Sequence, residues 1–143
     1  MGRVKQEKYT DGTAIVRGAP SLTPKLNLTI MVTLFTETRD YPRYDLRQVH
    51  ALAAIQKVYL TRSAQRDMRA IRYELDDVCR CLGELKSSNF RHSGRYEDPL
   101  WYDVYRIRFT SPTEHVDDLY IKLSLGRGCL VIDLFSFHLT RTI

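Results

Sequence analysis

The stretch that decides the fold is DLYIKLSL, residues 118–125, in which apolar and polar side chains alternate without interruption. Successive side chains of a β-strand point to opposite faces, so a period of two is typical of a strand with one buried and one polar face. The buried set would be Leu119, Ile121, Leu123 and Leu125, and the polar set Asp118, Tyr120, Lys122 and Ser124. We therefore predict an amphipathic strand that borders a hydrophobic core.

Two more strands are predicted, one on each side of this stretch in the chain. Residues 102–109 place Asp103, Tyr105, Ile107 and Phe109 on one face and Tyr102, Val104, Arg106 and Arg108 on the other. Downstream, the sequence Gly-Arg-Gly at residues 126–128 predicts a tight turn into an apolar strand that ends at His138. The last two strands should form a hairpin within an antiparallel sheet of three or more strands.

The chain upstream of the strands has helical periodicity. A first helix is indicated by the stripe Leu46, Val49, Leu52 and Ala53. Asp45 is its candidate N-cap, Thr61 or Ser63 can cap a second short helix, and residues 75–85 carry the apolar face of a third. Helices followed by an antiparallel meander indicate an α+β fold, with two or three N-terminal helices packed on the sheet.

The 143 residues suit one folded domain with a long N-terminal extension. Residues 1–43 show no sustained period, and we expect them to be partly disordered or to add an edge strand, for which residues 26–35 are the candidate. The folded domain would span residues 44–143. Within it, residues 89–100 contain Gly94 and Pro99 among polar residues and are predicted to form a loop.

Composition favours a polyanionic partner and gives no sign of a metal or membrane protein. Lys and Arg outnumber Asp and Glu by 22 to 17, for a net charge of +5 and a pI near 9.2. Cys79, Cys81 and Cys129 have no metal-ligand spacing, which favours reduced cysteines and no zinc. The charged N-terminus lacks a signal-peptide core, and residues 26–35 are far short of the ~20 residues of a membrane span. We predict a cytoplasmic protein without membrane contact.

No cofactor or metal motif is present in the sequence, so the candidate chemistry rests on one polar sheet face. If the strands pair as predicted, that face gathers Tyr102, Arg106, Arg108, Tyr120, Lys122 and His138, with His92 in the loop above. Histidine, with a pKa near 6.5, suits a base that takes a 2′-hydroxyl proton and an acid that protonates the leaving oxygen. Arginines can grip phosphate, and tyrosines can stack on bases. The same residues also suit an ordinary solvated sheet surface.

Five short blocks in the second part of the chain resemble the MqsR toxin family. They are TRSA at residues 61–64, NFRHS at 89–93, WYDVYR at 101–106, LYIKL at 119–123 and FSFH at 135–138. The family has Thr-Arg-Ser-Ala, Phe-Tyr-Lys-Ser, Trp-Gln-Asp-Val-Tyr, Tyr-x-Lys and Ser-Phe-Lys blocks in the same order. The resemblance runs from about Tyr44 to His138, which makes residues 44–143 an MqsR-like toxin domain.

This resemblance implies a RelE-like toxin fold and cleavage of mRNA without a metal or cofactor until a cognate antitoxin, encoded nearby, binds the toxin. The family's active positions fall on His92 and His138, where the family usually has Lys, on Tyr102, where it has Gln, and on Tyr120, which is unchanged. We expect these four residues to be catalytic. Phosphate-binding roles are expected for Arg91, Arg106, Arg108 and Lys122.

Three interpretations remain open from the sequence. The first is a metal-independent endoribonuclease toxin of a type II toxin–antitoxin system that cuts mRNA by 2′-hydroxyl attack and inhibits growth. The second is a catalytically inactive RNA-binding or regulatory module of the same fold, because Lys and Gln are absent from the family's active positions. The third is a RelE-like nuclease that acts only on ribosome-bound mRNA. Growth arrest on expression separates the first from the second, and cleavage of naked RNA sets the third aside.

Overall fold

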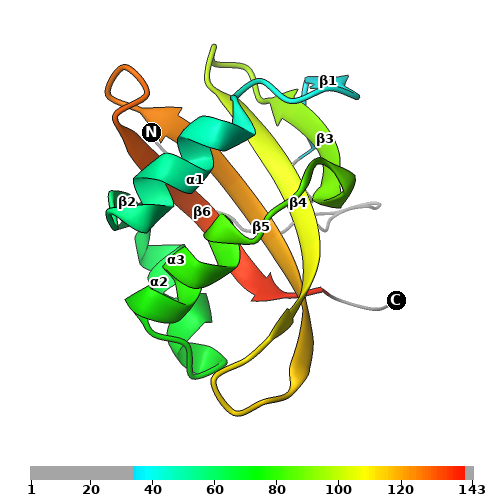
Figure 1. Cartoon of the computed structure of the whole chain (residues 1–143). Coiled ribbons are helices and arrows are strands. Elements are labelled where there is room, and N and C mark those ends of the chain that lie inside the picture. The colour runs from blue at the N-terminus through cyan, green and yellow to red at the C-terminus, as the bar shows by residue number, and fades with distance from the viewer. Residues whose placement is uncertain (1–33, 141–143) are drawn as a thin grey trace, which may run out of the picture. The chain divides into compact units, whose positions relative to one another are not determined.

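A computed structural model describes residues 34–140 of the chain. The chain divides into two units, residues 1–35 and 36–143, and all the described helices and strands lie in the second. The strand expected at residues 26–35 falls almost entirely outside the described residues. The second unit is an α+β fold with three α-helices and one six-stranded sheet (Figure 1).

The sheet has the strand order β1-β3-β4-β5-β6-β2. Its strands are β1 (Glu37–Arg39), β2 (Val58–Leu60), β3 (Phe90–Arg95), β4 (Trp101–Thr110), β5 (Val116–Gly126) and β6 (Val131–Leu139). Neighbouring strands from β1 through β6 are antiparallel, as predicted for the central three, whereas β2 pairs with β6 in parallel. The expectation of a purely antiparallel sheet is therefore wrong. It failed because β2, with three residues, is too short to show a period.

The three helices begin where capping chemistry allows. Helix α1 (Leu46–Ala54) has Asp45 as its N-cap, and the Asp45 side chain accepts a hydrogen bond from the backbone N–H of Arg47. Helix α2 (Arg62–Ala70) is capped by Thr61, whose Oγ1 accepts from Ala64 N at 3.2 Å. Both predicted caps are confirmed. Helix α3 (Leu75–Gly83) instead begins with a capping box of Glu74 and Asp77.

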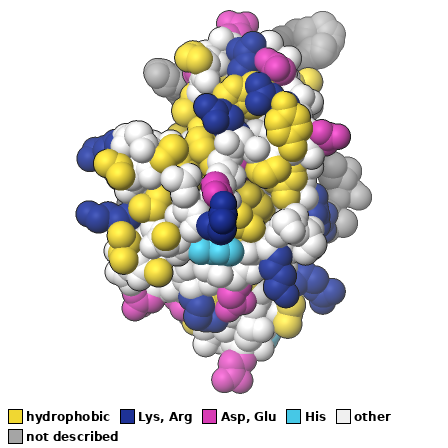
Figure 2. All heavy atoms as spheres, turned by 45° about the horizontal axis from the view of Figure 1, so that its top comes forward, with side chains coloured by type: hydrophobic (Ala, Val, Ile, Leu, Met, Phe, Trp, Pro, Cys, Tyr) yellow, Lys and Arg dark blue, Asp and Glu magenta, His cyan; other side chains and the backbone are white. Residues whose placement is uncertain are grey.

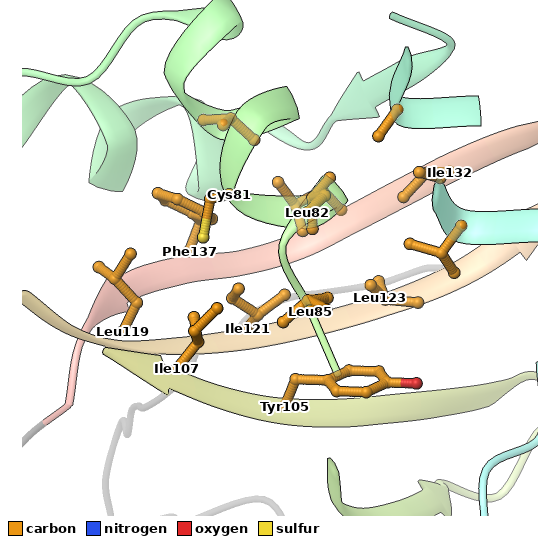
Figure 3. Close-up of a cluster of buried hydrophobic side chains, with 14 of the residues drawn as sticks. Cys81, Leu82, Leu85, Tyr105, Ile107, Leu119, Ile121, Leu123, Ile132 and Phe137 are labelled. Atoms are coloured by element: carbon orange, nitrogen blue, oxygen red, sulfur yellow. The ribbon is translucent and has the colours of Figure 1, made fainter. Parts of the chain in front are cut away.

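All three helices cover the same face of the sheet, where they enclose the core (Figure 1). Figure 3 shows Cys81 and Leu82 of α3 above the side chains of β4, β5 and β6. The sheet contributes Tyr105, Ile107, Phe109, Leu119, Ile121, Leu123, Leu125, Ile132, Leu134 and Phe137 to this core. The two alternating stretches of the sequence thus bury the apolar faces that their periods predict.

The segment 89–100, predicted as a loop, is mostly ordered structure. A 3-10 turn (Ser87–Asn89) leads into β3, and only residues 96–100 connect β3 to β4 without regular structure. His92 therefore lies on a strand and not in a loop. The segment lacks β-branched residues, so its local preference is weak, and its strand is stabilised by pairing with β4 on one side and β1 on the other. Because β1 and β2 lie among the helices in the chain, the predicted helices-then-sheet order is also wrong.

Strand β6 contains a β-bulge that changes which side chains face the core. Ile132 and Leu134 are buried in the core, and an unbroken period of two would bury Ser136 and His138 next. The pairing with β5 instead shifts by one residue at Phe135, so that Leu134 lies opposite Leu123 and Ser136 opposite Lys122. The core position passes to Phe137, and His138 lies on the face opposite the helices.

A buried carboxylate on β4 fixes the start of the domain. Asp103 has no exposed surface, and its two oxygens accept the backbone N–H groups of Arg43 and Tyr44, each at 2.9 Å. Burial raises the pKa of Asp103, although these hydrogen bonds act in the opposite direction. The carboxylate thus holds the segment that precedes α1 against the sheet.

Replacing Asp103 with Ala should destabilise the fold, because the N–H groups of Arg43 and Tyr44 lose their acceptor and a small cavity replaces the buried carboxylate. We expect a loss of about 2 kcal/mol in the free energy of unfolding and a smaller loss for Asp103→Asn, which keeps one oxygen. Urea unfolding followed by circular dichroism measures both. Asp40→Ala, at an exposed position nearby, is the matched control and should change stability by less than about 0.5 kcal/mol. Equal stability of Asp103→Ala and this control would contradict the role assigned to the carboxylate.

Candidate active site

The candidate site lies on the sheet face opposite the helices, here called the second face. It is defined by His92 of β3, Tyr102, Arg106 and Arg108 of β4, Tyr120 and Lys122 of β5, and His138 of β6. In the strand register, His92 is paired with Val104, Val104 with Lys122, and Lys122 with Ser136. One step further along, Arg106 pairs with Tyr120 and Tyr120 with His138. The structure therefore places on one face the six residues that the predicted strand register gathers, and His92 joins them from β3 and not from a loop.

Tyr120 and His138 form the most compact part of the second face. Their rings are stacked, with centroids 5.1 Å apart and planes inclined by 14°. The Nδ1 atom of His138 lies 2.9 Å from the carbonyl oxygen of Leu139, which can only accept a hydrogen bond. Nδ1 therefore carries the hydrogen, and in the neutral ring Nε2 holds the lone pair. This tautomer suits His138 to act as a base.

Lys122 lies at the centre of the second face and is only 6% exposed. Its ammonium Nζ donates a hydrogen bond to the hydroxyl of Tyr96 at 3.0 Å, and it lies 5.2 Å from the ring centroid of Tyr102 and 5.4 Å from that of Tyr96. Aromatic faces attract a cation, and the attraction grows when water is excluded. The two tyrosines thus hold a positive charge in a fixed place.

His92 lies on the far side of Lys122 from His138. Burial lowers the pKa of His92 below its ordinary value, and the charge of Lys122 lowers it further. Strands β4 and β5 lie between the two histidines, and a strand spacing of about 4.8 Å puts β3 and β6 roughly 14 Å apart. The two imidazoles can therefore reach a common group only if that group binds between them, over Lys122.

The arginines of the candidate site differ in the groups that they contact. Arg106 forms a two-pronged ion pair with Asp118, with nitrogen–oxygen distances of 3.0 and 2.7 Å, and this contact lowers the pKa of Asp118. Arg91 donates from Nη1 to the carbonyl oxygens of Ser88 and Phe90, both at 3.1 Å. Arg108 is exposed beyond Arg106 on β4. Figure 2 shows another side of the molecule, with the helices of Figure 1 toward the viewer, and there basic side chains are scattered among acidic and apolar ones.

Two aromatic residues of the second face were missed in the sequence. The ring of Tyr96 lies 5.4 Å from Tyr102, and the ring of Phe135 lies 4.8 Å from Tyr102 on the other side, both edge-to-face. Tyr96 follows β3 in a polar segment without periodicity. Phe135 follows the buried Leu134, so alternation along β6 puts it on the second face, and the bulge changes only the residues after it. The position of Tyr96 therefore carries no sequence signal, whereas the alternation of Ile132 and Leu134 could have predicted that of Phe135.

Within residues 34–140, no cluster of three His, Cys, Asp or Glu side chains could hold a metal ion. Cys79, Cys81 and Cys129 are unbridged, and burial raises the pKa of the Cys81 thiol. The described helices are all too short and too polar to cross a bilayer.

A family model described as "Motility quorum-sensing regulator, toxin of MqsA" matches residues 41–138. The chain belongs to the MqsR toxin family. The matched range includes every residue of the second face as well as α1, α2 and α3. A comparison with curated proteins gave no match. The family resemblance read from the five sequence blocks is thus confirmed, and the family is described as the toxin counterpart of MqsA.

The electrostatic link between Lys122 and His92 can be measured directly. Removing the positive charge with Lys122→Gln should raise the pKa of His92, because its imidazolium form no longer lies near an ammonium group. NMR titration of the His92 ring protons in both proteins measures the change. The variant Arg62→Gln, which removes an exposed charge on α2, is the matched control and should leave the pKa of His92 unchanged. An unchanged or lowered pKa of His92 would show that Lys122 does not act on it.

Proposed function

We propose that this chain is an endoribonuclease toxin of a toxin–antitoxin pair, which cuts mRNA in the cytoplasm without a metal and is neutralised by a cognate antitoxin of the MqsA kind. Membership in the MqsR toxin family supports the toxin role. The observation that carries the nuclease activity is the placement of His138, Tyr120, Lys122 and His92 on one sheet face. It offers proton-transfer groups on both sides of a fixed cation.

In the proposed mechanism, a phosphodiester binds over Lys122. The Nε2 atom of His138 takes the proton of the 2′-hydroxyl, the 2′-oxygen bonds to phosphorus, and the bond from phosphorus to the 5′-oxygen breaks. The imidazolium of His92 gives its proton to that leaving oxygen. The products are a 2′,3′-cyclic phosphate and a 5′-hydroxyl, and DNA is not cut because it lacks the nucleophile.

The other side chains of the second face stabilise and position the substrate. Lys122 and Arg106 offset the negative charge that grows on the phosphoryl oxygens, in a setting where fixed charges need no reorganisation. Tyr120 holds the His138 ring by stacking, and Tyr102 offers an aromatic edge to a base. Arg91 and Arg108 supply further phosphate contacts.

A second candidate, a catalytically inactive RNA-binding or regulatory module, is favoured by two observations. Of the four active positions, only Tyr120 keeps the residue usual in the family. Arg106 is already paired with Asp118, and the two histidines are separated by two strands. Such a module would keep the fold and bind RNA without cutting it.

Purified protein should cut single-stranded RNA in the presence of EDTA and leave 2′,3′-cyclic phosphate ends. Each of His92→Ala and His138→Ala should reduce the cleavage rate by about 10²-fold or more, because each removes one proton-transfer group. His115→Ala removes an exposed imidazole outside the second face and should leave the rate unchanged. Undiminished cleavage by the His92→Ala/His138→Ala double variant would refute the assignment, and loss of cleavage in EDTA would refute metal independence.

Growth separates the toxin from the inactive module. Induced expression in bacteria should arrest growth, whereas the His92→Ala/His138→Ala variant at the same protein level should not, because the arrest requires RNA cleavage. Colony counts after induction, with His115→Ala as the active control, give the measurement. Equal growth of cells that express the wild type and the double variant would favour the catalytically inactive module.

A further inference from the structure

A second basic feature lies beside the part of β4 that extends past its pairing with β3 and is paired only with β5. The pairing of β3 with β4 stops at Phe90 opposite Tyr105, while β4 runs on to Thr110. A groove of about 500 Å³ opens beside this part of β4. Its walls carry the charged side chains Glu84, Lys86, Arg91, Arg106, Arg108 and Asp118.

The groove is positively charged and polar. It is lined by four cations and two carboxylates, and one of those carboxylates, Asp118, is bound to Arg106. The guanidinium of Arg91 is held at the wall by the carbonyl oxygens of Ser88 and Phe90. Such a fixed, planar guanidinium is well suited to bind phosphate, since little freedom is lost when the anion arrives.

The groove adjoins the candidate active site through Arg106. This residue is in register with Tyr120 and His138 on one side and lines the groove on the other. Arg108 follows it two residues further along β4, which is about 7 Å in an extended strand. A polyanionic chain that crosses the second face beside His138 would therefore meet the groove next.

We infer that this groove binds a phosphate of the RNA strand beside the cleaved bond, with Lys86, Arg91 and Arg108 as its ligands. The inference rests on the proposed function for the identity of the polyanion. Lys86 has no place in the sequence-derived site and enters only through the groove. The groove would add affinity and fix the direction of the strand without taking part in proton transfer.

Single-stranded DNA of 12 nucleotides and mixed sequence is a suitable probe, because it has the phosphates but no 2′-hydroxyl and stays uncut. Its binding to the full chain is followed by fluorescence anisotropy between 50 and 200 mM NaCl. The triple variant Lys86→Gln/Arg91→Gln/Arg108→Gln should bind on the order of tenfold more weakly at 50 mM. The slope of log K against log salt should become shallower by about 0.7, the change expected when one phosphate of a single strand is no longer neutralised.

Two further variants make the result specific. Arg62→Gln/Arg66→Gln/Arg69→Gln removes the same charge from exposed positions on α2, which covers the other face of the sheet, and should leave the slope unchanged. Glu84→Gln removes a carboxylate from the groove wall and should tighten binding. A misfolded protein cannot produce that gain.

An unchanged slope in the groove triple variant, or an equal reduction in the α2 control, would overturn the inference. The outcome for the proposed function is separate. If wild type binds the DNA through the groove but cuts no RNA, the groove is supported as a phosphate-binding site and the proposed nuclease activity is refuted. If wild type and the groove variant cut RNA at the same rate and with the same KM, the nuclease activity is supported and the role of the groove in RNA binding is refuted.

Discussion

One inserted residue in β6 determines which of its side chains can serve a site. The helices occupy one face of the sheet, so a functional side chain must point to the other. Ile132 and Leu134 point to the helices, and without the bulge at Phe135 the polar Ser136 and His138 would follow them into the core. Burying Phe137 instead is favourable by about 1.5–3 kcal/mol, and an unpaired imidazole in the core would cost more. Hydrophobic burial therefore holds the bulge, and the bulge puts His138 beside Tyr120.

Sequence reasoning succeeded where each local pattern agreed with the tertiary structure. The periods of β4 and β5 and the caps Asp45 and Thr61 predicted their elements because burial and capping act within a few residues. It failed for β2 and β3, whose residues form strands only because a neighbouring strand offers hydrogen bonds. Pairing partners that lie 40 or more residues away, as for β2 and β6, leave no trace in a window of ten residues.

The candidate site shows the same division. The residues of β4 and β5 on the second face followed from alternation, and the predicted pairing of the last strand put His138 beside them, but His92 was expected in a loop above the face. The sequence did not predict the contacts that these side chains make with their neighbours. These are the hydrogen bond from Lys122 to the hydroxyl of Tyr96, the ring of Phe135 against Tyr102, and the ion pair of Asp118 with Arg106. Each contact joins two segments whose separation in space depends on strand register or on a bulge. The periodicity of a single strand predicts neither of these.

The position of His92 also decides how the proposed chemistry can use it. Burial and the charge of Lys122 both lower the pKa of His92, so without substrate its protonated form is less favoured than that of an ordinary histidine. A phosphodiester bound over Lys122 brings a negative charge that offsets the lysine's field and thereby raises the pKa of the neighbouring imidazole. The substrate itself would thus supply the charge that keeps the acid protonated, and the charge that grows in the transition state would strengthen the effect. A histidine beside a buried lysine is then compatible with the proposed acid role, because a bound phosphodiester would favour its protonated form.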